Sequence, residues 1–579
     1  MATSPLGAGA REAEDAVWTE LSGKGGIPIN VSPVHRLRIS GNPPPGLAAL
    51  PKDNRPANRH RGEQIMAGKW RFGHSTVDTP ARHAPWGPAF PSLHFADRIH
   101  RFHWLRDVAS LGPDGEAHAR ALVVGWVDMF GKWENFAWRH SIAAERLVNF
   151  LCAGPWLLGA LQGDARTALL DTIGRHMRHL HVSLPEEADP QTRFKMTVGM
   201  CLAGAAADDK KILEAGLAAL ETECGAQILA DGGHASRSPE ALAEAMLDIQ
   251  SVEELLLRLG LNAPAFLTKL QPRMAAMLSF FQLPDGGVLT ANGGGDCVSG
   301  LARAALRPHT ALTSRFSFAR LSAYQRIQAE DLTVYVDAGP GPERPHGGRA
   351  HAGALAITVD DGPERLVTSC GANPDLELAL QDASRRTAAH SVLSLNGEDS
   401  AVFTPDPATG LRAPEGPAQL SIRRLEEGDQ ILLEGQHGGW RVRHGLIYRR
   451  RLYVAKNGAR ITGEDSLSRP MSETALAMSN ALIPFEIRFH LHPDVQVVDG
   501  PDDRTVFLGL SRRQRVWRFR SETLLSVENS RYWGSEAARK TRQLVIRGVA
   551  DPAADGTQAP NRVRWALSRI EPGVQGEAA

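Results

Sequence analysis

Hydrophobic residues recur at helical spacing from about residue 90 to residue 283. For one helix of this region, Ser238 and Pro239 predict the start and Gly260 the end. Short gaps between the hydrophobic sets imply antiparallel neighbours, which close into a ring or stack into a superhelix. The sets that each predict one face of a helix are Leu122, Trp126, Met129 and Phe130; Leu169, Ile173, Met177 and Leu180; Leu213, Leu217 and Leu220; and Leu242, Met246, Ile249, Val252 and Leu256.

From about residue 316 the hydrophobic pattern changes to the alternation that is typical of strands. In 485–492 the alternation is sharp, because Phe485, Ile487 and Phe489 face one way and the polar residues between them face the other. Short strands separated by Gly, Pro and Asp turns, with no helices between them, predict a large antiparallel sandwich. The predicted strands are 332–336, 355–359, 430–434, 440–455, 485–492, 504–510, 515–520, 543–547 and 562–567.

Length and composition narrow the classes of protein. A chain of 579 residues is too long for one hydrophobic core, so at least two domains are expected. A formal net charge of zero argues against a general nucleic-acid binder, although it allows a local basic groove. The five cysteines include no CxxC pair, which indicates neither a disulfide framework nor a zinc knuckle. No stretch of the sequence is long and apolar enough to predict a transmembrane helix. The first residues lack the basic and apolar regions of a signal peptide.

Short motifs follow one another in order from about residue 64 to residue 567. Together they resemble the heparinase II/III family, and especially its proteobacterial branch. In the helical region they are Gln64–Gly68, Phe102 with Trp104 and Leu105, Arg146–Asn149, Asp231-Gly232-Gly233-His234, Arg237-Ser238-Pro239 and Leu283–Gly287. In the strand region they are Ala350-His351-Ala352, Arg386–Ser391, His444-Gly445-Leu446 and Arg488–Pro493.

The resemblance implies a multidomain fold, first α and then β. An irregular lead-in at 1–60 precedes an N-terminal (α/α) toroid at 61–312 and a C-terminal antiparallel β-sandwich at 316–575. It also implies a carbon–oxygen lyase that cleaves an acidic, uronate-containing, glycosaminoglycan-like polysaccharide by β-elimination. That reaction needs a group that neutralises the uronate carboxylate, a base for the C5 proton and an acid for the leaving oxygen.

The sequence departs from the family pattern at the expected catalytic tyrosine. The family commonly places a Tyr just after the Arg-Ser-Pro segment, where this chain has Ala241 and Leu242. The Asn-His pair that neutralises the carboxylate in relatives falls near Thr192 and Arg193. The toroid therefore supplies no Tyr, since all the tyrosines of the chain come later, at Tyr324, Tyr335, Tyr448, Tyr453 and Tyr532.

We assign candidate roles in the helical region from the motifs. Arg193 would neutralise a uronate, His234 would exchange the proton, and Arg237 would lie on the same cleft rim. The alternatives are an inter-helix salt bridge for Arg193 and an ordinary loop histidine for His234. Arg146 and Trp138 are candidates for substrate binding, with a buried acidic pair and a helix-face core position as their alternatives.

The strand region supplies a second set of candidates. His351 and His390 match the two histidines of a divalent-metal site in some relatives, so they could hold zinc or calcium, or one could act as acid or base. Thr368 or Ser369 stands where the metal-binding Asp would be, and a polar network is the alternative reading.

Two further residues of the strand region belong to this set. Arg386 could bind an anionic group, and Tyr448 could replace the missing acid or base. The alternatives are a solvated strand face for the arginine and a core-edge position for the tyrosine.

Two other functions remain open at the level of sequence. A catalytically degenerate protein could bind a polysaccharide of the cell envelope without cutting it. A glycoside hydrolase could use Asp231 with Glu186, Glu187 and Asp189. The resemblance implies a periplasmic or envelope location, whereas the missing signal peptide keeps a cytoplasmic one open. The expected partner is an acidic polysaccharide or oligosaccharide, and not a nucleic acid.

Overall fold

The computed structural model describes residues 33–87, 89–295, 300–309, 316–406, 411–470, 481–535, 537–554 and 556–570. The chain divides into two compact units, which we describe separately. The first unit runs to Gln227 and also contains Glu244–Pro272 and Asp375–Leu380. The second unit contains Ile228–Ala243, Arg273–Pro374 and the chain from Gln381 onward.

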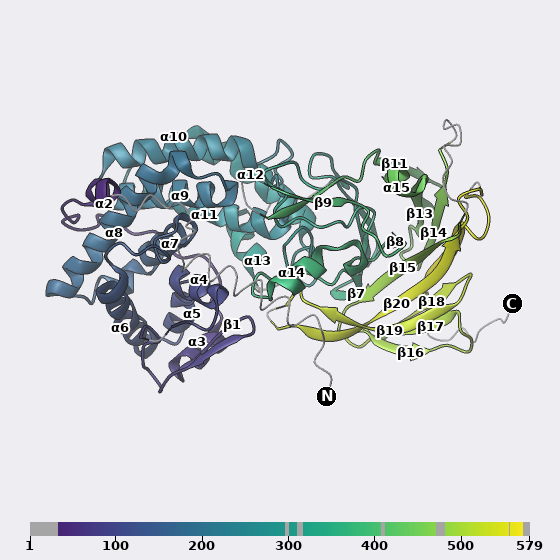
Figure 1. The fold of residues 1–579 in the computed structure, drawn as a ribbon, viewed down its shortest axis with the longest axis horizontal. Helices are drawn as coiled ribbons and strands as arrows, with labels where there is room; N and C mark the ends of the chain where they lie inside the picture. The colour runs from purple at the N-terminus through teal and green to yellow at the C-terminus, as the bar shows by residue number, and fades with distance from the viewer. Residues whose placement is uncertain are drawn as a thin grey trace. The chain divides into compact units, whose positions relative to one another are not determined.

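The amino-terminal part of the chain is helical, as the spacing predicts (Figure 1). None of the described helices has the length and hydrophobicity that crossing a bilayer requires. Over the whole described chain, the α-helices are α2 (Pro33–Ile39), α3 (Arg59–Met66), α4 (Leu93–Arg101), α5 (Leu105–Ala109), α6 (Pro113–Phe130), α7 (His140–Leu157), α8 (Gly163–Ser183), α9 (Pro190–Ala206), α10 (Lys210–Gln227), α11 (Pro239–Arg258), α12 (Ala265–Phe281), α13 (Leu301–Leu306), α14 (Leu378–Arg385) and α15 (Arg441–His444).

Helix α9 lies at the centre of the first unit. The Asp189 side chain caps its N-terminus by accepting a hydrogen bond from the Thr192 backbone, and Pro190 occupies the first turn. Almost all of its residues are buried, because α9 packs against α7, α8 and α10. A hairpin of β1 (Lys69–Phe72) and β2 (Ser75–Asp78) also belongs to this unit.

The second unit contains two large antiparallel sheets. Sheet I has eight strands in the order β11-β12-β13-β14-β21-β18-β17-β16. Its strands are β11 (Ser421–Glu427), β12 (Gln430–Trp440), β13 (Leu446–Ala455), β14 (Arg460–Ser468), β16 (Gln496–Asp499), β17 (Thr505–Leu510), β18 (Arg515–Ser521) and β21 (Arg562–Ile570).

Sheet II has nine strands, in the order β19-β20-β15-β7-β6-β5-β4-β3 with β8 paired to β15. Its strands are β3 (Phe318–Ala319), β4 (Tyr324–Ala329), β5 (Leu332–Asp337), β6 (Ile357–Asp361), β7 (Glu364–Thr368), β8 (Leu393–Leu395), β15 (Ile483–Leu491), β19 (Leu525–Tyr532) and β20 (Arg539–Ala550). A small separate hairpin pairs β9 (Val402–Pro405) with β10 (Arg412–Glu415).

One hydrophobic core joins the two sheets. It contains Phe489 of sheet II together with Phe519 and Trp565 of sheet I. The rings of Phe519 and Trp565 stack with 5.8 Å between their centroids. The alternation in β15 is as predicted, since Phe485, Ile487, Phe489 and Leu491 are all buried. The predicted fold class, helices followed by an antiparallel sandwich, is thereby confirmed.

Three details differ from the sequence expectations. The predicted strand 440–455 is interrupted by the short helix α15, after which Gly445 turns the chain at a φ of +68°. Helix α14 also lies within the region that was expected to contain only strands. Residues 33–39 of the expected irregular lead-in form α2, while residues 1–32 lie outside the described part of the chain.

Candidate functional site

The Asp231–His234 turn is held by its own side chains within the second unit. The Asp231 carboxylate accepts hydrogen bonds from the backbone N–H groups of Gly233 at 3.1 Å, Leu321 at 2.8 Å and Ser322 at 2.7 Å. Gly232 has a φ of +91°, and a Cβ there would lie 2.2 Å from the Arg273 carbonyl oxygen. The glycine is therefore required, and Asp231 fixes the turn.

His234 is buried and its protonation state can be assigned. Its Nδ1 accepts a hydrogen bond from the Ser236 backbone N–H at 3.1 Å and lies 2.7 Å from the Ser236 hydroxyl. Burial, together with the charge of His346, lowers the pKa of His234 to about 3, so the ring is neutral at pH 7. Since Nδ1 accepts, the single proton resides on Nε2. This ring can donate a hydrogen bond, but its basic nitrogen is occupied.

The Arg237 guanidinium donates to four internal acceptors. It donates to the carbonyl oxygens of Ser322 and Ala323, each at 2.9 Å, to that of Pro340, and to the Asp337 carboxylate. Burial alone would lower the pKa of Arg237, but Asp337 raises it above its ordinary value. Arg237 therefore stays charged inside the protein, and internal acceptors engage four of the five N–H groups of its guanidinium.

Tyr324 and Asn292 connect Arg237 to the histidine pair. The Tyr324 hydroxyl donates to the Arg237 carbonyl oxygen at 3.1 Å and accepts from Asn292 Nδ2 at 2.7 Å. Asn292 Oδ1 accepts from the His351 backbone N–H at 3.1 Å. The sequence analysis missed both residues. The only local signal was an Asn in a glycine-rich stretch, where the structure gives Asn292 a φ of +46°.

His351 and His390 form a chain of neutral imidazoles. His351 Nε2 accepts from the Gly293 backbone N–H at 2.9 Å, so the ring proton of His351 is on Nδ1. That proton is donated to His390 Nε2 at 3.0 Å, and His390 Nδ1 donates to the Arg386 carbonyl oxygen at 2.9 Å. Burial lowers the pKa of both rings, which agrees with their neutral state.

The pair does not fit the divalent metal that the resemblance suggested. A histidine that binds a metal needs a ring nitrogen with a free lone pair. The lone pairs of His351 Nε2 and His390 Nε2 already accept hydrogen bonds. No group of three potential His, Cys, Asp or Glu ligands occurs among the described residues. Gly353 packs closely against this pair, since a Cβ at this position would lie 2.7 Å from the His390 ring.

Arg193 belongs to the first unit, where it joins α9 to α10. Its Nε donates to the Glu223 carboxylate at 2.8 Å, and its Nη1 donates to the carbonyl oxygens of Leu184 and Glu187. This is the inter-helix salt bridge that the sequence left open as an alternative. Its role as a uronate neutraliser stays a prediction.

Arg146 and Trp138 lie in the core of the same unit. Arg146 is fully buried, and its guanidinium contacts His176 and donates to the carbonyl oxygens of His100 and Ala137. It also lies 4.3 Å from the centroid of the Trp126 ring. These groups replace the acidic partner that was expected. Trp138 is fully buried and packs on His176, with 4.1 Å between ring centroids.

Tyr448 lies between the two sheets of the second unit. Its hydroxyl donates to the Asp465 carboxylate at 2.5 Å, and Arg450 and Trp565 donate to the same carboxylate. Burial raises the pKa of Tyr448 well above its usual value, so this tyrosine is a poor base. Arg450 continues to the carbonyl oxygens of Leu355 and Ser391.

Arg386 is paired with two carboxylates. Its Nη1 donates to Asp399 at 3.0 Å and its Nε donates to Asp382 at 3.1 Å. The guanidinium also lies 4.4 Å from the Phe403 ring centroid. The structure thus joins Arg237, His351 and His390 in one buried network of the second unit, and it gives most of the remaining candidates internal partners.

Comparisons with known proteins agree with this fold. A family model described as Heparinase II/III-like, C-terminal, matches residues 311–566. FtsZ-localized protein C of Caulobacter vibrioides is 30% identical over 549 residues, which cover 93% of this chain and 92% of that protein.

Solved structures are similar in fold at low sequence identity. A crystal structure of heparinase III aligns with a TM-score of 0.65 at 13% identity, covering 96% of this chain and 89% of that chain. A heparan sulfate lyase HepC mutant from Pedobacter heparinus aligns with a TM-score of 0.58 at 14% identity, covering 94% and 88%. At this level of identity the likeness extends to the fold, an α/α toroid followed by a β-sandwich.

Proposed function

Because this chain belongs to the heparinase II/III-like family, we propose that it is a member that acts by binding and does not cleave glycans. The observation that carries the proposal is that internal hydrogen bonds engage the candidate catalytic groups. The basic nitrogens of His234, His351 and His390 all accept internal hydrogen bonds, and Arg237 has four internal acceptors.

β-Elimination makes demands that these groups do not meet. A base must accept the C5 proton directly, and a donor must stabilise the developing carbanion through the carboxylate. Breaking the internal hydrogen bonds of a buried group to free it for substrate costs about 1–3 kcal/mol for each group. With Ala241 and Leu242 at the family's tyrosine position, the toroid supplies no tyrosine that could act as the base.

The relative supports a binding role and suggests where it operates. FtsZ-localized protein C is named for its localisation with FtsZ, and it is similar to this chain over almost the whole length. We extend this property to the present chain and propose that it too localises with FtsZ. A fluorescent fusion in Caulobacter vibrioides cells that lack the relative should gather where FtsZ gathers, and a diffuse signal would contradict this part.

One assay separates binding from catalysis. The full chain is incubated with heparan sulfate, chondroitin sulfate and polygalacturonate while the absorbance of unsaturated uronates is followed. We expect no increase in absorbance. An increase that His234→Ala abolishes would instead establish the lyase on an acidic glycan that the resemblance implies. New reducing ends without the absorbance would indicate the hydrolase that uses Asp231.

A further inference from the structure

The face of sheet I that points away from the core carries a trough. Side chains alternate along β13 and β14, so that Tyr453, Ala455, Arg460 and Thr462 face outward while their neighbours are buried. Small outward residues lie on neighbouring strands here: Thr462 is opposite Ala566, Ala455 is opposite Gln430, and Ser568 is opposite Arg460. The hollow that they leave has a volume of about 430 Å³.

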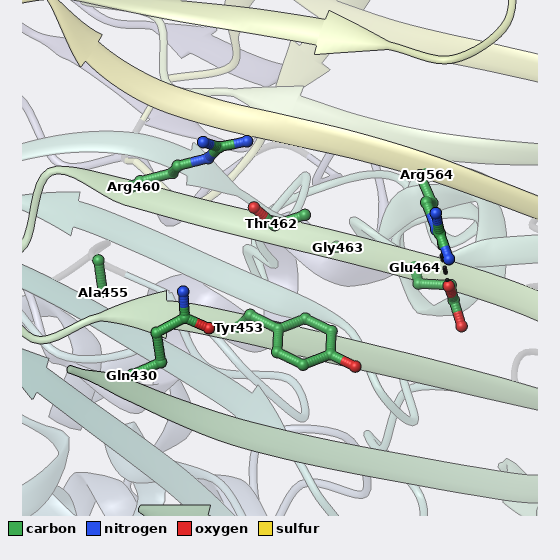
Figure 2. A pocket seen from close by; sticks show the side chains of 8 residues that line it. All are labelled: Gln430, Tyr453, Ala455, Arg460, Thr462, Gly463, Glu464 and Arg564. Carbon is green, nitrogen blue, oxygen red and sulfur yellow. Dashed lines mark hydrogen bonds and ion pairs between the residues drawn. The ribbon is translucent and has the colours of Figure 1, made fainter. Parts of the chain in front are cut away.

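Figure 2 shows the residues that line the trough and the directions of their side chains. The Glu464 and Arg564 side chains are joined across the strands by a 3.0 Å ion pair. Arg460 forms no ion pair or side-chain hydrogen bond within the part of the chain that the structure describes. The lining consists of Gln430, Tyr453, Ala455, Arg460, Thr462, Gly463, Glu464 and Arg564.

The floor of the trough is tightly packed. Gly463 faces the core, where a Cβ would lie 2.1 Å from the Trp565 ring. The indole of Trp565, which also belongs to sheet I, donates a hydrogen bond to the Asp465 carboxylate at 2.8 Å. A ligand in the trough would therefore meet a preformed surface, which reduces the entropic cost of binding.

The outer face around the trough is basic, although the whole chain is neutral. Ser568 on β21 lies between Arg460 on β14 and Arg518 on β18. The backbones of the two arginines are therefore two strand spacings apart, which is about 10 Å. Neither arginine forms an ion pair among the described residues. The outward charged residues of β11–β14, β18 and β21 are Arg423, Arg449, Arg451, Arg460, Arg518, Arg520, Arg562 and Arg564, against Glu427, Glu434 and Glu464.

We propose that this trough and its flanking arginines bind an acidic, extended segment of a partner polypeptide. The inference rests on the proposed function, in which the chain acts by binding. Exposed guanidinium groups pair with carboxylates in two-pronged hydrogen bonds, and a row of them selects for a row of carboxylates. Strand addition is excluded here, because β13 and β14 are already paired on both edges.

The width of the basic face fits an extended polypeptide, and its single aromatic ring favours a polypeptide over an acidic glycan. The arginines extend from β11 to β18, about 24 Å across the sheet at five strand spacings, which suits an extended segment of about seven residues. Along this length the trough lining offers a single aromatic ring, that of Tyr453, whereas a sugar chain gains affinity by lying against several aromatic faces.

The test is a titration of the full chain with a labelled oligo-glutamate peptide, followed by fluorescence anisotropy. We expect binding that weakens as salt is raised. The double change Arg460→Glu and Arg518→Glu should weaken it at least about tenfold, since two charge-assisted contacts become repulsive. Thr462→Trp should weaken it similarly without any change of charge, because the indole fills the trough.

The matched control is Arg531→Glu, which reverses an exposed charge on β19 of sheet II. It should leave the affinity unchanged, and thermal unfolding should show that every variant is folded. Equal weakening by the control, or full affinity in Thr462→Trp, would overturn the proposed site. Stronger binding of polygalacturonate or oligothymidylate than of oligo-glutamate would overturn the polypeptide assignment.

Failure of this inference can be told apart from failure of the proposed function. If the wild-type chain neither cleaves glycans nor binds oligo-glutamate, the proposed function stands and the proposed peptide site is wrong. A chain that produces unsaturated uronates would lose the proposed function, whatever the peptide titration shows.

Discussion

The buried network of the second unit and the trough on sheet I use the same kinds of side chain in opposite ways. In the network, Arg237, Tyr324 and His351 are each less than 8% exposed, and their polar atoms contact other buried side chains or the backbone. On the trough, Tyr453 and Arg460 reach solvent, and the arginine keeps its hydrogen-bonding capacity. The difference teaches that residue type suggests chemistry, whereas unused capacity at a surface is what permits binding.

The sharpest way to break this comparison is to remove Arg237. Arg237→Ala removes the guanidinium that pairs with the buried Asp337 carboxylate and donates to three carbonyl oxygens, so we expect a loss of about 3–5 kcal/mol in unfolding free energy. Urea denaturation measures the loss, with Arg531→Ala as the exposed control. Near-native stability of Arg237→Ala would show that the network is not structural, and would reopen a catalytic role for it.

A second change asks whether the trough is as tightly packed underneath as the network is. Gly463→Ala places a methyl group against the Trp565 ring, and overpacking of this kind costs about 1–3 kcal/mol. Gly225→Ala on α10, where nothing lies within 4 Å of the added Cβ, is the matched control and should not be destabilising. Equal unfolding midpoints for the two variants would mean that the floor yields.

The pH dependence of stability sharpens the network side of the comparison. The folded pKa of His234 is lowered to about 3, while an unfolded histidine titrates near 6.5. The unfolded chain therefore binds a proton that the folded chain refuses, so stability is lost as the pH falls below about 6.5. His234→Gln should flatten the slope by up to ~1.4 kcal/mol per pH unit. Parallel profiles of the two proteins would contradict the buried, neutral state of His234.

The smallest effect is expected for an arginine of the outer face. Arg518→Ala should change the unfolding free energy by less than about 0.5 kcal/mol, because it removes an exposed charge without an ion partner among the described residues. The same variant should still weaken the binding of oligo-glutamate. A marked loss of stability would show that this arginine is part of the fold, and would remove it from the proposed surface.

The elements were predictable where local pattern and burial agree. Pro239 begins α11 as expected, and Gly260 follows its end with a φ of +71°. The same alternation rule was less informative for β5, where both faces are buried and Thr333 is as enclosed as Val334. A strand covered on both sides carries no polar face to read from the sequence.

The site was predictable only in part, because its partners are distant in sequence. The motifs brought His351 and His390 to attention, but Asn292 and Tyr324 join them across long stretches of chain. Which nitrogen of each ring carries the proton depends on backbone groups such as that of Gly293, and the sequence does not reveal those contacts. The pattern thus located the histidines without revealing that they are occupied.

The Asp465 carboxylate has a mechanical consequence. It receives Tyr448, Arg450 and Trp565, and Arg450 extends from sheet I to the carbonyl oxygens of Leu355 and Ser391 beside the strands of sheet II. Shear between the two layers would have to rupture charged bonds in a medium of low dielectric constant. A pulling force applied to the outer face would accordingly be shared by both layers, so the sandwich should resist load as one body.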